Sequence, residues 1–116
     1  MSSITDLYNE AEQLKDKGDF EEAAAKLQTL LEQQESYTLA HLALAVIYGK
    51  LGRHEDAVRH GQRACELEPK DPFNFTAMSV TYQRASLGVS NAQDNQRYIQ
   101  LAEQAMAQAH TLQSGG

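Results

Sequence analysis

Residues 38–71 read TLAHLALAVIYGKLGRHEDAVRHGQRACELEPKD, two helix-forming runs that are separated by Gly52 and closed by Pro69. Glycine commonly follows the last residue of a helix, and proline commonly lies just beyond one. In the first run, Ala45 precedes Tyr48 by three residues, so both side chains lie on one helix face. A small side chain lets a second helix approach closely, and the bulky one fills the space beside it. The segment therefore predicts two antiparallel helices in close contact.

Parts of this pattern recur at intervals of 34 residues. Small residues share one register, bulky residues share a second, and the glycine and alanine around the turn align: Ala11, Ala45 and Ser79; Leu14, Tyr48 and Tyr82; Gly18 and Gly52; Ala23 and Ala57. A repeat of this length is typical of stacked helix pairs. We therefore expect helices at about 4–17, 20–34, 38–51, 54–67, 72–86 and 92–112, with ends placed to within 2–4 residues.

The residues between these segments carry signals for the start of a helix. Asp19 follows a glycine and precedes Glu22 by three residues, which is the spacing of a capping box. Asp71 has the residue type that caps helices, and Pro72 suits the first helical turn, where no N–H donor is needed. Two new helices are therefore expected to begin directly after Asp19 and Asp71.

Two further features concern packing. Gly61 lies inside an expected helix, where glycine costs roughly 1 kcal/mol relative to alanine, so we expect a large neighbour such as Phe75 or Tyr82 to approach it closely. The inward face of the last helix is expected to consist of Ala102, Met106, Ala109 and Leu112.

Together these residues carry a resemblance to a known family. Residues 38–71 contain Leu44-Ala45-x-x-Tyr48, Gly52, Ala57 and Ala64-x-x-Leu67-x-Pro69, and this combination resembles the tetratricopeptide repeat. Residues 4–37 match at the equivalent alanine and glycine positions but have Glu35 where the family favours proline. The third unit begins well and then departs, because residues 85–97 are longer than the tight turn of the family.

The resemblance implies an all-α fold, a right-handed α-solenoid of three helix-turn-helix units. The units would span about 4–37, 38–71 and 72–112 of a single domain 1–112, followed by a flexible tail, 113–116. The third unit would combine an extended turn with a long C-terminal helix that caps the array, because the last repeat must cover an apolar face.

The family architecture also implies a concave groove lined by the first helix of each unit. The expected partner-binding residues are Tyr8, Glu12, Leu39, Leu42, Val46, Phe73, Thr76, Val80 and Gln83. The centre of this set is apolar, and an exposed apolar patch usually marks an interface. We therefore expect an adaptor or scaffold that binds a peptide or an amphipathic helix. One alternative is that the groove or the final helix drives homo-oligomerisation, and another is that the chain's own termini cover the groove.

One specialisation of the family is disfavoured. Chaperone adaptors hold a terminal carboxylate with Lys, Asn and Arg side chains, and the corresponding positions here are Tyr8, Glu12, Ala43, Phe73 and Ala77. None of these offers a cationic hydrogen-bond donor, and Glu12 would repel a carboxylate. We therefore expect no chaperone carboxylate clamp.

Composition narrows the remaining classes of function. The net charge is −6 with dispersed basic residues, whereas nucleic-acid binders carry a concentrated positive surface. No apolar run approaches the roughly 20 residues needed to cross a bilayer. The single cysteine, Cys65, forms no internal disulfide, which is compatible with the reducing cytoplasm. We therefore expect a cytoplasmic protein that binds neither nucleic acid nor the membrane interior.

The side chains that could do chemistry are scattered. No histidine pair has the four-residue spacing of a helical metal site, so we expect no metal and no cofactor. His41 is expected to pack in the core, and His54 and His60 are expected to face solvent. Cys65 is expected to be a structural or surface thiol. An enzyme remains a distant alternative that would require His41 and Cys65 to converge.

Overall fold

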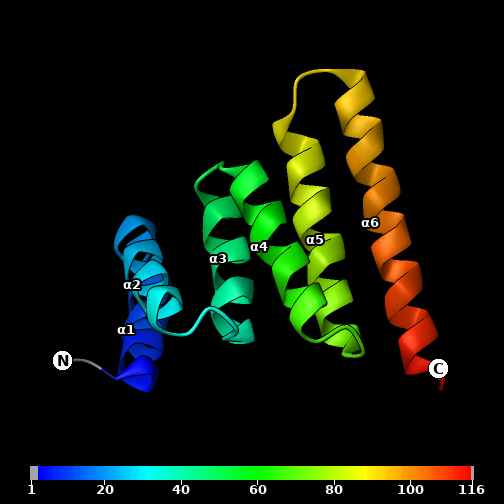
Figure 1. Cartoon of the computed structure of the whole chain (residues 1–116). Helices are drawn as coiled ribbons and strands as arrows, with labels where there is room; N and C mark the ends of the chain where they lie inside the picture. Colours follow the sequence, from blue (N-terminus) through cyan, green and yellow to red (C-terminus); the bar gives the residue numbers. More distant parts are fainter. Residues whose placement is uncertain (1–2, 116) are drawn as a thin grey trace.

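The computed structural model describes residues 3–115, and its regular elements are six α-helices. In chain order these are α1 (Ile4–Asp16), α2 (Phe20–Gln33), α3 (Thr38–Lys50), α4 (His54–Leu67), α5 (Pro72–Gly88) and α6 (Ala92–Gln113). They form a row in which helix pairs follow one another along the sequence, with the two chain ends at opposite ends of the row (Figure 1). The expected all-α helical-repeat solenoid is confirmed.

The first two turns have the same backbone conformation. Gly18 and Gly52 have φ values of 84° and 78°, a left-handed region that residues with a side chain rarely adopt. The residue after each glycine donates its N–H across the helix end, from Asp19 to the Leu14 carbonyl and from Arg53 to the Tyr48 carbonyl, both at 2.8 Å. The alignment of the two glycines in the sequence therefore reflects one repeated turn.

The helix starts agree with the predictions in part. Asp71 accepts a hydrogen bond from the Phe73 N–H at 3.0 Å, and Pro72 occupies the first turn of α5. Asp19 occupies the cap position of α2, but its side chain makes no capping hydrogen bond, so the predicted capping box with Glu22 is wrong. Asn91, for which no capping role was predicted, caps α6 by accepting a hydrogen bond from the Asp94 N–H at 2.7 Å.

Contacts between helices define two faces of the row. Within each unit the two helices pack together, and α2 and α4 each pack on the first helix of the next unit. Across units the backbones of α1 and α3, and of α3 and α5, approach one another, whereas the backbones of α2 and α4, and of α4 and α6, stay farther apart. Because α1, α3 and α5 approach one another more closely, they lie on the concave side of the row.

The predicted close crossings are confirmed. Ala11, Ala45 and Ser79 are buried, and the Ser79 hydroxyl donates to the Ala102 carbonyl at 3.0 Å, which joins α5 to α6. The apolar core around the first four helices includes fully buried Leu27 and Leu44. A second cluster surrounds Met78 and Tyr82 where α4, α5 and α6 meet.

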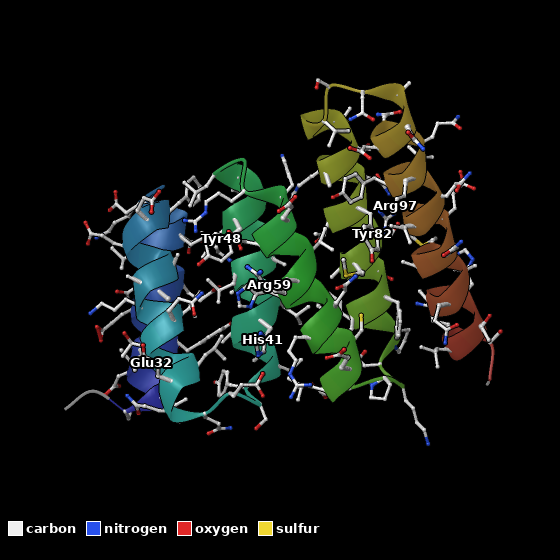
Figure 2. The ribbon with its side chains drawn as sticks, turned by 45° about the horizontal axis from the view of Figure 1, so that its top comes forward. Glu32, His41, Tyr48, Arg59, Tyr82 and Arg97 are labelled. Atoms are coloured by element: carbon white, nitrogen blue, oxygen red, sulfur yellow. The ribbon has the colours of Figure 1, made fainter. Side chains whose placement is uncertain are left out.

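The repeat extends to hydrogen bonds between units. Gln28 of α2 donates to the Tyr48 hydroxyl of α3 at 2.9 Å, and Gln62 of α4 donates to the Tyr82 hydroxyl of α5 at 3.1 Å. Both the donors and the acceptors are 34 residues apart. Tyr48 and Tyr82 lie in successive units of the row (Figure 2). The same bond therefore fixes how each unit follows the preceding one.

The third unit differs from the expectation in the position of its extra residues. Helix α5 continues to Gly88 and α6 begins at Ala92, so most of residues 85–97 are helical and only 89–91 separate the two helices. The α5–α6 hairpin consequently extends beyond the other hairpins (Figure 1). Helix α6 buries Ala102, Ala105 and Ala109, whereas Met106 and Leu112 are only partly buried.

The neighbour of Gly61 also differs. A Cβ atom built on Gly61 would lie 2.7 Å from Met78 Sδ and 3.9 Å from Ala45 Cβ. The close approach is therefore real, but Met78 makes it instead of Phe75 or Tyr82. Met78 is buried and fills the space that a side chain at position 61 would need.

Candidate functional site

Large apolar side chains gather on the concave side, on α3 and α5. Their spacing of three or four residues keeps each set on one face of its helix. We call this set the concave strip: Leu39, Leu42 and Val46 of α3, with Phe73, Thr76 and Val80 of α5. The exposed fractions of Leu39, Phe73 and Val80 are 51%, 62% and 39%. These three are among five large apolar side chains that are exposed within residues 3–115.

A groove of about 220 Å³ lies between α3 and α5 within this strip. Leu42, Val46, Phe73, Thr76 and Val80 line it, so five of the predicted residues come together, and Leu39 lies one turn before Leu42. The lining also includes Ala45, Gly61 and Ala77. The Thr76 hydroxyl donates to the Pro72 carbonyl at 3.2 Å, so its donor is already used. The groove therefore offers a mainly apolar surface.

The other three predicted residues lie outside this groove. Tyr8 packs against Tyr37 with ring centroids 5.8 Å apart, and Glu12 forms an ion pair with Lys15 at 3.2 Å. Partial burial, with the nearby Glu12 carboxylate, raises the pKa of Tyr8. Gln83 lines a separate hollow between α5 and α6 and donates to the Ser79 hydroxyl at 3.2 Å.

Arg84 lines the groove and was not among the predicted residues. It follows Val80 by four residues on α5, so helical spacing alone places it on the same face. The family register assigns Gln83 as the next groove position after Val80, so Arg84 was not predicted.

Comparison with protein-family models agrees with the repeat seen in the structure. The model described as Tetratricopeptide repeat matches residues 8–72, more than half of the 116-residue chain. The chain belongs to the tetratricopeptide repeat family. A comparison with curated proteins found no match.

Tetratricopeptide repeats generally mediate protein–protein interactions. The matched region includes α3 and the turn before α5, and the lengthened α5–α6 hairpin lies beyond it.

Among residues 3–115, no helix combines the length and the apolar character that crossing a bilayer requires.

A histidine network lies inside the second repeat. His41 is 4% exposed, its Nδ1 is 3.0 Å from Nδ1 of His60, and its Nε2 is 2.8 Å from the Glu35 carbonyl oxygen. The Glu35 carboxylate in turn accepts two hydrogen bonds from Arg63, at 2.7 and 2.8 Å, which lower its pKa. This network ties the loop before α3 to both helices of the repeat; His41 is labelled in Figure 2.

The expectation for His54 and His60 is wrong, because both are half-buried. Burial, with the neighbouring His41, lowers the pKa of His60 to about 4. The His54 ring packs against Gly88, and its Nδ1 is buried without a hydrogen-bond partner among the described residues. No group of three or more His, Cys, Asp or Glu side chains within residues 3–115 has a metal-binding arrangement.

Cys65, predicted to be a structural or a surface thiol, is partly buried. Its Sγ donates to the Asn74 carbonyl oxygen at 3.5 Å, between α4 and α5. Burial, with the neighbouring Glu66, raises the pKa of the thiol to about 11, so it stays protonated at neutral pH. Because the thiolate is the reactive form, this position is poorly suited to nucleophilic chemistry.

Proposed function

We propose that this tetratricopeptide repeat protein is an adaptor whose concave strip binds an apolar segment of another protein, in the form of an amphipathic helix. The observation that carries the proposal is the exposure of Leu39, Phe73 and Val80 on one concave face. Fully burying an exposed side chain of this size contributes roughly 1.5–3 kcal/mol, and covering the exposed part of each of these three contributes about half of that. A partner that covers all three therefore has a substantial driving force.

The surroundings of the strip support an external partner. Helix α6 packs on α5 and its side chains also meet α4, but no residue of α6 lines the groove beside α3. The groove of about 220 Å³ has room for one large apolar anchor. Interfaces commonly concentrate their binding energy in such an anchor and its pocket.

Self-association is the second candidate. Leu87 and Ile99 are exposed on the α5–α6 hairpin, with exposed fractions of 85% and 41%. They lie outside the concave strip and would give a second copy an apolar contact at the end of the row. In this reading the chain would be a self-assembling scaffold.

The test is a double variant, Leu39→Ser with Phe73→Ser, matched by the control Leu87→Ser. Peptides of about 14 residues are selected from a displayed library on the wild-type protein, and their affinity for each variant is measured by fluorescence anisotropy. We expect the double variant to lose binding at least tenfold while its circular dichroism is unchanged, and we expect Leu87→Ser to bind normally. Peptides that bind the double variant as well as the wild type would overturn the proposal. Light scattering then decides the second candidate: a dimer that Leu87→Ser dissociates favours self-association.

A further inference from the structure

Arg84 places a positive charge at one end of the otherwise apolar groove. Phe73, Ala77, Val80 and Arg84 follow one another at intervals of three or four residues along one face of α5. The Arg84 stem extends toward α3, since a Cβ atom built on Gly49 would lie 3.6 Å from Arg84 Cδ. The guanidinium is therefore a continuation of the concave strip, one turn beyond Val80.

No carboxylate lies within 4 Å of the Arg84 guanidinium in the part of the chain that the structure describes, and it makes no hydrogen bond there. The three arginines of the second repeat are paired, Arg53 and Arg59 with Asp56, and Arg63 with Glu35, whereas Arg84 on α5 and Arg97 on α6 form no ion pair among the described residues. The chain has 16 acidic and 10 basic residues, so acids are plentiful elsewhere on its surface. The unpaired guanidinium beside an apolar groove is available to a partner.

We propose that Arg84 binds the carboxylate of a glutamate or aspartate side chain on the docked segment. The inference rests on the proposed function and names the chemistry of its partner. Val80 and Arg84 are one helical turn apart, about 6 Å along the axis. The partner helix therefore carries an apolar anchor and an acidic residue three or four positions apart on one face.

Electrostatics makes this contact selective. A hydrogen bond between guanidinium and carboxylate is stronger than one between neutral groups, and apolar surroundings strengthen it further. The net charge of −6 would otherwise favour basic segments, so Arg84 reverses the local preference at the groove. Arg84 also lies outside the five positions that correspond to the chaperone clamp.

The test selects peptides from a displayed library of 14-residue segments with both ends blocked, so that only side chains supply carboxylates. Selection is run on the wild type, on Arg84→Gln, and on Arg97→Gln as a control with the same change of charge; Arg97 lies on α6 (Figure 2). We expect an acidic residue three or four positions from an apolar anchor in peptides selected on the wild type and on Arg97→Gln, but not on Arg84→Gln. A representative peptide should bind the wild type about five- to tenfold more tightly than its Glu→Gln analogue.

The outcomes separate the two proposals. If the Glu and Gln peptides bind the wild type equally, and both lose binding to the Leu39→Ser/Phe73→Ser variant, the adaptor proposal stands and the role of Arg84 is wrong. If Arg84→Gln keeps the preference for Glu, another cation binds the carboxylate and the inference also fails. Peptides that bind the double variant as well as the wild type refute the adaptor proposal itself, and recovery of no peptide from the wild type counts against both.

Discussion

The first helices of the three repeats occupy equivalent places in the fold, but they carry different residue types on the concave side. At equivalent positions, α1 has Thr5, Tyr8 and Glu12, whereas α3 has Leu39, Leu42 and Val46. Tyr8 and Glu12 are engaged by neighbours in the chain, whereas Leu39 is half-exposed. The repeat therefore sets the position of each side chain. The residue type at that position decides whether the side chain is engaged by neighbours in the chain or is exposed to a partner.

Buried contacts build the repeats, and the repeats hold the exposed concave strip in place. If the two sets are separable, substitutions at the crossings change stability and substitutions on the strip do not.

The largest effect is expected at the helix crossings. Ala45 is buried beside Gly61, so Ala45→Leu should overpack the crossing and destabilise the protein by about 2–3 kcal/mol. Ala11→Leu should have a smaller effect, about 1–2 kcal/mol, because it lies near the end of the array. Urea denaturation monitored by circular dichroism measures both. Wild-type stability in Ala45→Leu would mean that the crossing can expand, which contradicts the packing described for α3 and α4.

The next effect is a dependence of folding stability on pH, which is caused by the histidine network. The neighbours of His60 are His41 and Tyr48 of α3 and Arg59 and Asp56 of α4. In the unfolded chain His60 binds a proton near pH 6.5, whereas in the folded protein its pKa is about 4. Lowering the pH through this window therefore favours the unfolded state, by about 1–2 kcal/mol after allowance for solvent screening.

Denaturation at several pH values between 7 and 4 checks this effect. The variant His60→Gln should show a flatter dependence, because the group that titrates has been removed. His110→Gln is the matched control, since His110 is exposed on α6 and should leave the dependence unchanged. Equal slopes in wild type and His60→Gln would show that other groups cause the pH dependence.

Two glycines of the second repeat should respond in opposite directions. A Cβ atom at Gly61 would overlap Met78, so Gly61→Ala should destabilise the protein by about 1 kcal/mol despite its better helix propensity. At Gly49 the nearest contact would be an ordinary 3.6 Å from Arg84 Cδ, so Gly49→Ala should stabilise the protein by about 0.5 kcal/mol. Thermal melting of the two variants gives the sign of each effect, and a shift in the same direction for both would refute the distinction.

The smallest effect on stability is expected on the concave strip. Leu39 and Phe73 are exposed, so the Leu39→Ser/Phe73→Ser variant should change the free energy of unfolding by less than about 1 kcal/mol. Urea denaturation of this double variant and of Ala45→Leu under the same conditions compares their free energies of unfolding directly. A loss as large as that of Ala45→Leu would mean that the strip is part of the core.

The sequence predicted the helices well because alanine, glycine and proline act locally. Gly18 and Gly52 end helices through their own backbone conformation, and the register of Ala11 and Ala45 follows from helical spacing. The length of α5 was less predictable. Gly88 has a low helix propensity, but it lies where a Cβ atom would overlap the His54 ring, and this contact joins residues distant in sequence.

The candidate site could be predicted only where the repeat register applied. That register brought Leu42, Val46, Phe73, Thr76 and Val80 to one groove. It did not anticipate Arg84, because the family register continues to Gln83, although helical spacing from Val80 places Arg84 on the groove face. The pairing of His41 with His60 was missed for another reason, since it depends on how α3 crosses α4.

The position of the groove across the boundary between two repeats has a thermodynamic consequence. Because repeats contact mainly their neighbours, the array can open at one boundary while the remainder stays folded. The groove uses α3 from the second repeat and α5 from the third, so a bound segment would bridge that boundary. Binding would then raise the folding cooperativity of the two repeats, and amide hydrogen exchange in α5 and α6 would slow in proportion to the occupancy of the groove.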